Sequence, residues 1–147
     1  MKTLSLASLL LTVSLLLPAA RAADELKTLS GQWSVASAVF AGQALPPPVL
    51  AGMSLRMDGA SYEATVETEK GKIVDKGTVA LSTAAQLKRM TITGTDGPNK
   101  GKTFLAIYEL NGDTLRVCYD LGGGPHPTEF KSAPDTKLLL TTYQRAK

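Results

Sequence analysis

The chain has 147 residues, which suits one domain, with a formal charge of +3, one cysteine and one histidine. The single cysteine excludes an internal disulfide. A zinc site needs about three or four ligands, so Cys118 and His126 alone are too few, and we expect neither a metal nor a cofactor.

Residues 1–22 have the three parts of a cleavable signal peptide. Lys2 provides the positive start, residues 4–17 form an apolar run, and Ala20-Arg21-Ala22 places small residues where a signal peptidase needs them. Pro18 is expected to break any helix that continues the run. A retained membrane anchor is the competing interpretation, but the run is short for a bilayer span of ~20 apolar residues.

Cleavage is predicted before Ala23, with Ala19 or Ala20 as alternative sites. Residues 23–147 would then form a single periplasmic or extracellular domain with no stable membrane span. Loss of two basic residues with the leader leaves 14 of the 16 against 13 acidic residues, a formal charge of +1. A nearly neutral domain does not predict nucleic acid as a partner.

The mature part consists of short segments in which apolar residues recur at every second position, the period of a strand. A lead-in of at most one helical turn at 23–29 precedes these segments. The first strand ends before Pro46, Pro47 and Pro48, which cannot donate to a sheet. Gly77 is expected to bend the fourth strand. Asp58-Gly59 and Asn111-Gly112 are hairpin turn signals. The expected strands are 31–40, 53–57, 61–67, 73–81, 87–93, 103–110, 114–119, 128–131 and 138–144.

These short strands at hairpin spacing, with no long helix, predict an all-β fold. An antiparallel meander favours an up-and-down, lipocalin-like β-barrel of about eight to nine short strands, because closure removes the sheet edges. Gly31 and Trp33 on the first strand, with Arg145 after the last, are similar to the lipocalin pattern. We expect the indole to close one end of the barrel and the guanidinium to stack on it.

One segment imitates a phosphate-binding loop. Residues 97–103, GPNKGKT, end in the expected Gly-Lys-Thr, but only three residues separate the two glycines where the motif needs four. The segment also lies between two expected strands, whereas a phosphate loop precedes a helix. We therefore interpret it as a polar hairpin connection.

The sequence offers one conventional nucleophile pair, Cys118 with His126. Cys118 lies inside an expected strand, where burial raises a thiol pKa, and His126 lies in a loop between prolines. Nothing in the spacing of the glutamates distinguishes a catalytic pair from solvated strand positions. We therefore expect no enzymatic activity. The glutamates considered are Glu63, Glu67, Glu109 and Glu129.

Several motifs occur together along the chain. They are LxGxW at 29–33, Gly94 with GPNKGKT, IYELxGDTL at 107–115 with Cys118, PTEFKS at 127–132, and Arg145. In this combination the chain resembles a family of small lipocalin-like domains of unknown function from planctomycete-type bacteria. The resemblance implies a barrel and an extracytoplasmic setting, and it brings no activity. The family pattern has Arg where this chain has His126, which implies a weaker or pH-dependent contact if that position touches a partner.

The first functional hypothesis is a binding barrel. Small inward residues such as Ala64 and Ala106 would leave a cavity for a small apolar ligand. An interior filled by Trp33, Phe104 and methionines would contradict this hypothesis. Four tyrosines could orient the ligand: Tyr62, Tyr108, Tyr119 and Tyr143.

The second hypothesis is an envelope or extracellular interaction module. The loops 94–102 and 121–127 would contact a protein or a polysaccharide from one rim of the barrel, since loops on a rigid scaffold commonly carry function.

Overall fold

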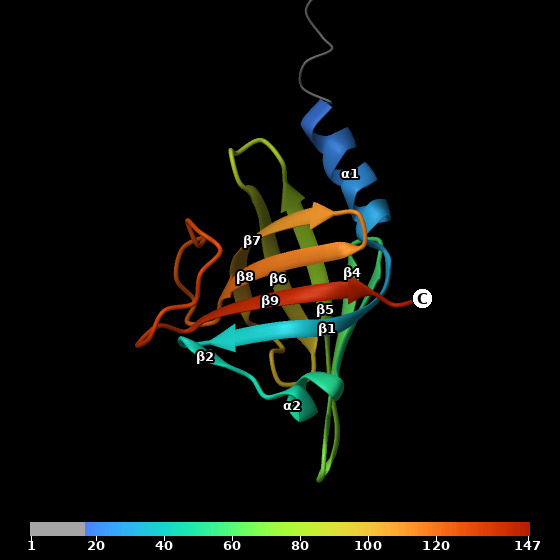
Figure 1. The fold of residues 1–147 in the computed structure, drawn as a ribbon. Coiled ribbons are helices and arrows are strands. Elements are labelled where there is room, and N and C mark those ends of the chain that lie inside the picture. The colour runs from blue at the N-terminus through green and yellow to red at the C-terminus, as the bar shows by residue number, and fades with distance from the viewer. Residues whose placement is uncertain (1–16) are drawn as a thin grey trace, which may run out of the picture.

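The computed structural model describes residues 17–147, and within them it contains two helices and nine strands (Figure 1). The helices are α1 (Leu17–Leu29) and α2 (Pro47–Ala51). The strands are β1 (Gly31–Phe40), β2 (Gln43–Ala44), β3 (Met53–Asp58), β4 (Ser61–Thr68), β5 (Gly71–Ser82), β6 (Lys88–Asp96), β7 (Thr103–Asn111), β8 (Thr114–Asp120) and β9 (Leu138–Arg145).

The strands form one antiparallel sheet that closes on itself. Their order is β2-β1-β3-β4-β5-β6-β7-β8-β9, and β1 also pairs with β9. Eight strands therefore make the barrel wall, while the short β2 pairs only with the end of β1. This arrangement confirms the predicted up-and-down β-barrel.

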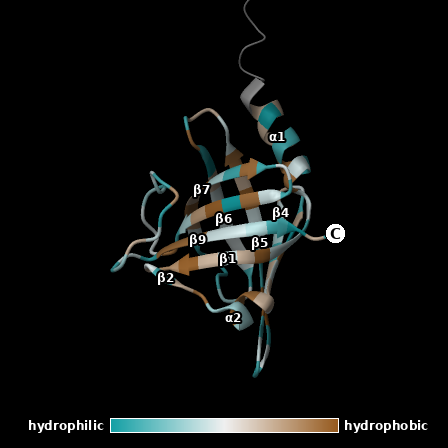
Figure 2. Cartoon of the chain, viewed as in Figure 1, coloured by the Kyte–Doolittle hydropathy of each residue, from teal (hydrophilic) through white to brown (hydrophobic). Residues whose placement is uncertain are grey.

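Hydrophobic and hydrophilic residues alternate along the strands (Figure 2). On β8 this alternation points Leu115 and Val117 into the barrel, where both are buried. On β7 both faces are covered, as the sequence predicts, because Ala106 and Ile107 point to opposite faces and are each at most 1% exposed. The segment 121–137 supplies the outer cover, and its His126 Nδ1 lies 3.0 Å from the Ala106 carbonyl oxygen.

The structure differs from the prediction at residues 128–131, which form no strand. Both edges of β8 are already occupied, by β7 on one side and β9 on the other, so this segment has no free edge to join. It runs outside the sheet instead, where the Lys131 carbonyl accepts a hydrogen bond from the Cys118 thiol at 3.6 Å. The short β2 was not predicted.

The N-terminal helix is longer than the expected single turn. Pro18 lies in the first turn of α1, where its missing N–H leaves no hydrogen bond unmade. The prediction that it breaks a helix of the apolar run falls on residues 1–16, outside the described residues. Most of the predicted leader, residues 1–16, lies outside the described residues, and the predicted cleavage point before Ala23 falls within α1. None of the helices in the described part of the chain is long and apolar enough to cross a membrane.

Three local irregularities adjust the predicted strands. A bulge between Val35 and Ser37 shifts the inward face of β1, so Ala38 is buried and Ser37 is exposed. The pairing of β5 with β6 shifts next to Gly77, the residue expected to bend the strand. The β7–β8 turn consists of Gly112 and Asp113, one residue later than predicted, and the φ of Gly112 is 61°.

Candidate functional site

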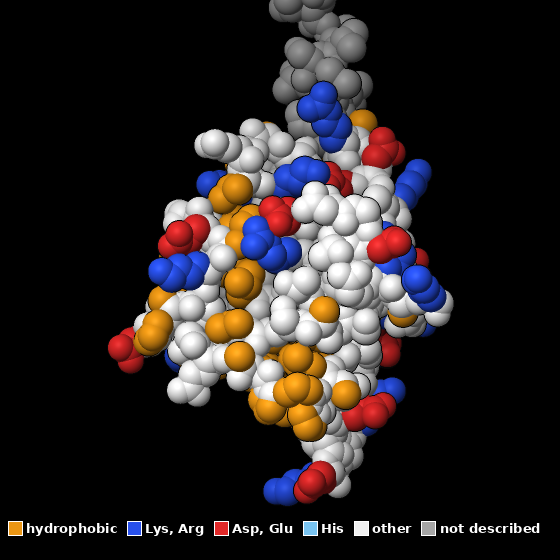
Figure 3. All heavy atoms as spheres, in the orientation of Figure 1, with side chains coloured by type: hydrophobic (Ala, Val, Ile, Leu, Met, Phe, Trp, Pro, Cys, Tyr) orange, Lys and Arg blue, Asp and Glu red, His pale blue; other side chains and the backbone are white. Residues whose placement is uncertain are grey.

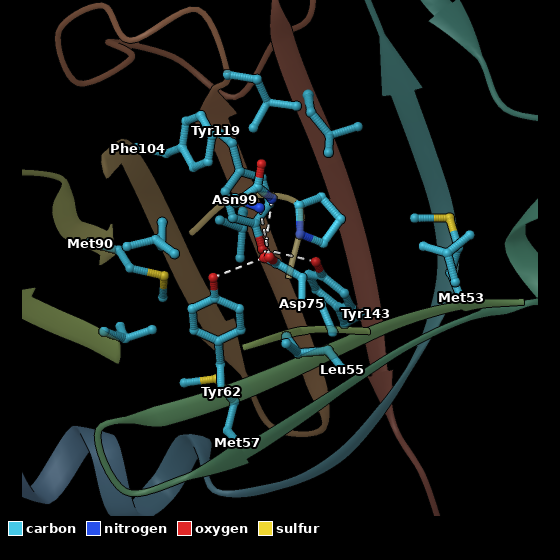
Figure 4. Close-up of a pocket in the computed structure, with 18 of the residues that line it drawn as sticks. Met53, Leu55, Met57, Tyr62, Asp75, Met90, Asn99, Phe104, Tyr119 and Tyr143 are labelled. Atoms are coloured by element: carbon cyan, nitrogen blue, oxygen red, sulfur yellow. Dashed lines mark hydrogen bonds between the residues drawn. The ribbon is translucent and has the colours of Figure 1, made fainter. Parts of the chain in front are cut away.

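The barrel contains a cavity of about 300 Å³ between strands β3 to β9, at the small end of the range for ligand pockets (Figure 4). Most of its lining is apolar. The interior is therefore not filled by Trp33, Phe104 and methionines, the packing that would have contradicted a binding barrel. The apolar walls include Leu55, Met57, Ala64, Met90, Ile92 and Val117.

The two ends of the barrel differ. Under α1 the interior is packed, because Trp33 and Leu29 are buried and the Trp33 Nε1 donates to the Leu29 carbonyl at 2.9 Å. At the opposite end the lining residues come from strand starts and loops, and Ile73 there is 47% exposed. The cavity is thus accessible from the end away from α1.

Exposed apolar side chains surround this accessible end. Phe40, Val49 and Ile73 are the large hydrophobic residues exposed in the described chain. Figure 3 shows hydrophobic side chains gathered over α2, which carries Val49.

A polar cluster interrupts the apolar wall at Asp75 (Figure 4). The Tyr62 hydroxyl donates to Asp75 Oδ2 at 2.9 Å. Asn99 donates twice, from its backbone N–H to Oδ1 and from its side-chain amide to Oδ2, both at 3.1 Å. The carboxylate therefore joins β4 and β5 to the loop between β6 and β7.

Two further tyrosines face the same cluster. The hydroxyl oxygens of Tyr119 and Tyr143 lie 2.8 Å apart, so one hydroxyl donates to the other. Burial raises the pKa of both tyrosines above its ordinary value. Burial, followed by the hydrogen bond to Asp75, also raises the pKa of Tyr62. All three hydroxyls consequently keep their protons at neutral pH.

Small residues create the space for this cluster. Gly77 pairs with Tyr62 across β4 and β5, and a Cβ on Gly77 would lie 2.7 Å from the Tyr62 ring. Gly97 has a φ of 89°, and a Cβ there would lie 2.4 Å from the Val74 carbonyl oxygen. A side chain at Gly97 would therefore push the loop away from β5 and separate Asn99 from Asp75.

The structure brings together three of the four predicted ligand-orienting tyrosines and separates the fourth. Tyr62, Tyr119 and Tyr143 line the cavity. Tyr108 is buried outside the cavity lining; burial raises its pKa, and the charge of Glu25 on α1 adds to the shift.

Sequence reasoning missed Asp75 and Asn99. The alternation of β5 contained a signal for Asp75, because it is separated by an even number of positions from Ile73 and Val79, which face inward. Asn99 carried no such signal, because its position depends on how the loop 97–102 folds back onto β5.

Gly31, Trp33 and Arg145, which were predicted to close one end of the barrel, lie at the packed end. The Arg145 guanidinium lies 4.3 Å from the centroid of the Trp33 ring. Gly31 has a φ of 134°, and a Cβ there would lie 3.1 Å from Arg145 Nη1. Arg145 belongs to β9 itself, whereas the sequence placed it just after the last strand.

The residues considered for catalysis or metal binding lie outside the cavity. Cys118 is fully buried, and burial raises the pKa of its thiol. Within residues 17–147 no three metal-ligating side chains gather at one place. The two rim loops do meet, since Asn99 and Lys102 line a shallow surface hollow together with Gly122 and Gly123.

Comparison with solved structures identifies the fold. The chain is similar to a lipocalin-like protein from Bacteroides uniformis, with a TM-score of 0.53 and 14% sequence identity over 80% of this chain and 98% of that one. It is also similar to an uncharacterized protein from Bacteroides eggerthii, with a TM-score of 0.51 and 10% identity over the same shares of the two chains. At these identities the likeness establishes a lipocalin-like fold. No family model matches the chain. No curated protein matches it either.

Proposed function

We propose that the protein is an exported, non-enzymatic barrel that binds a small apolar ligand in its central cavity. The observation that carries the proposal is the cavity of about 300 Å³ with apolar walls, inside a barrel whose other end is packed. A packed core of this size would ordinarily leave few voids larger than a water molecule. An apolar ligand would gain about 25 cal/mol for each Å² that it removes from water.

The exported setting is supported by the leader and by the motif resemblance to small domains of planctomycete-type bacteria. Without the leader, the start of the domain is still held by contacts with the barrel. Leu26 and Leu29, which lie after the predicted cleavage point, pack against the barrel core, and Glu25 forms an ion pair with Lys88.

The properties of the Cys118 thiol support a non-enzymatic role. Burial raises the pKa of Cys118, whereas a nucleophilic cysteine needs a lowered one. The His126 ring nitrogen Nδ1 is engaged by the Ala106 carbonyl, 3.0 Å away.

Binding of the neutral apolar dye Nile red tests the proposal. We expect a saturable rise in fluorescence with the wild-type protein and its loss in Ala64→Phe, because Ala64 lines the cavity and a ring there occupies the space. Ala80→Phe is the matched control, since Ala80 is an exposed residue of β5 outside the cavity. Equal binding by both variants, or no binding by the wild-type protein, would contradict the proposal.

The interaction module remains the second candidate because the two rim loops meet at one surface hollow. Reversing the charge of Lys100 and Lys102 separates the candidates. If dye binding survives and a co-purifying protein or polysaccharide is lost, the rim rather than the cavity carries the function.

A further inference from the structure

We propose that the cavity selects an amphiphile with an uncharged hydroxyl head group, and that Asp75 is the acceptor for that hydroxyl. This inference rests on the proposed function and specifies the class of ligand. An aliphatic alcohol fits the description, and a fatty acid does not.

The charge of the cavity lining disfavours an anionic head group. Among the described residues, those that line the cavity include one carboxylate, Asp75, and no lysine, arginine or histidine. A bound carboxylate ligand would place a second negative charge near Asp75 with no positive side chain to balance it. In surroundings of low dielectric this repulsion is much stronger than in water, so an anionic head group is disfavoured.

The Asp75 carboxylate has hydrogen-bond capacity left for a ligand. A carboxylate offers about four acceptor sites, and three donors from Tyr62 and Asn99 already use three of those on Asp75. One site remains for a donor from a ligand.

The tyrosine pair has one hydroxyl proton that the pair itself does not use. Tyr119 and Tyr143 share one hydrogen bond between two hydroxyls, so one hydroxyl proton is free to donate. Figure 4 shows the side chains of Tyr62, Asp75, Tyr119 and Tyr143 converging on one region of the cavity. The cluster thus offers one acceptor and one donor, which is what a hydroxyl needs. An ammonium group would be attracted by the charge of Asp75, but it carries three donors and one acceptor site of that carboxylate is free, so its charge would be buried with donors left unpaired.

Apolar surface lies on both sides of the polar cluster. Met57 and Met90 line the deeper part, and Val66, Ile73 and Leu139 line the accessible end. A hydrocarbon body would therefore be in apolar contact wherever it extends from the hydroxyl, while its polar atom stays hydrogen-bonded.

Displacement of Nile red by three ligands with the same chain tests the inference at neutral pH: decanol, decylamine and decanoate. We expect decanol to displace the dye at a concentration about tenfold or more below that of decanoate, and below that of decylamine, which corresponds to one well-formed hydrogen bond. In Asp75→Asn the concentrations of decanol and decanoate that displace the dye should differ by about threefold or less. Asp58→Asn removes the same charge from an exposed site outside the cavity and should behave as wild type.

A second variant covers the case in which Asp75→Asn releases the loop or fails to fold. Replacing both tyrosines of the pair, Tyr119→Phe together with Tyr143→Phe, removes the free donor and should weaken decanol about tenfold, with little change in Nile red affinity. The inference is overturned if decanoate or decylamine displaces the dye from wild type as well as decanol does, or if the double variant Tyr119→Phe, Tyr143→Phe leaves decanol unchanged. Failure of Nile red to bind the wild-type protein overturns the proposed function instead.

Discussion

Arg145 and Trp33 are register partners across the seam of the barrel, where β9 pairs with β1, and the guanidinium lies 4.3 Å from the centroid of the indole ring. The same guanidinium donates to the carbonyl oxygens of Ser30 at 2.9 Å and Thr28 at 2.7 Å. One side chain therefore connects the last strand, the first strand and the end of α1.

Replacement of Arg145 should loosen this connection. We expect Arg145→Ala to lower the free energy of unfolding by about 2–3 kcal/mol, since a cation–π contact and two hydrogen bonds to carbonyl groups are lost. Arg89→Ala, at an exposed position of β6, is the control and should change it by less than about 0.5 kcal/mol. Urea denaturation measures both, and equal effects would contradict the structural role of Arg145.

The buried tyrosines predict a loss of stability in alkali. Burial raises the pKa of Tyr119 and Tyr143 above the ordinary value of 10.0, so the folded protein holds these protons more tightly than the unfolded chain. The stability that they contribute is complete below pH 10 and falls as the pH rises toward the folded-state pKa values. Tyrosinate absorbance should therefore appear only as circular dichroism reports unfolding. Titration of these tyrosines near pH 10 in a protein that stays folded would contradict their burial.

Cys118 should behave as a structural residue. Its side chain is fully buried and burial raises its thiol pKa, so we expect a disulfide reagent to label the native protein only at the rate at which it unfolds. The urea-denatured chain serves as the positive control and should react at once. Rapid labelling of the folded protein would reopen the question of a reactive thiol.

Two N-terminal truncations test the role of α1. A protein of residues 23–147 keeps Glu25, Leu26 and Leu29, so its stability should match that of the chain with the whole of α1 to within about 0.5 kcal/mol. A protein of residues 30–147 loses both leucines and uncovers Trp33, which should cost about 3 kcal/mol or more in the free energy of unfolding. Equal stability of the two would show that α1 contributes nothing to the domain.

Much of the barrel could be predicted because the features that specify its strands and turns are local in the sequence. Period-two alternation and turn residues located the hairpins, as with β1, whose bounds Gly31–Phe40 match the prediction. The wrongly predicted strand depends on partners distant in the sequence. Residues 128–131 have a strand-like pattern, but β7 and β9 already occupy the edges of β8.

The candidate site was predicted in part. Alternation places Tyr62, Tyr119 and Tyr143 on inward faces, and it places Tyr108 there equally well. It cannot tell which level of the barrel is packed and which is hollow, because that depends on how α1 and Trp33 fill one end. The loop that delivers Asn99 to Asp75 depends on the backbone of Gly97, which a motif search cannot show.

Native mass spectrometry of the protein purified gently from its natural host tests the central claim most directly. Binding in the cavity predicts a species heavier than the polypeptide by the mass of one small apolar molecule, and this excess should disappear on denaturation. The same spectrum reports the mass of the chain, which is expected to begin at Ala23. A spectrum that contains only the bare polypeptide, from protein that also fails to bind Nile red, would contradict the binding function.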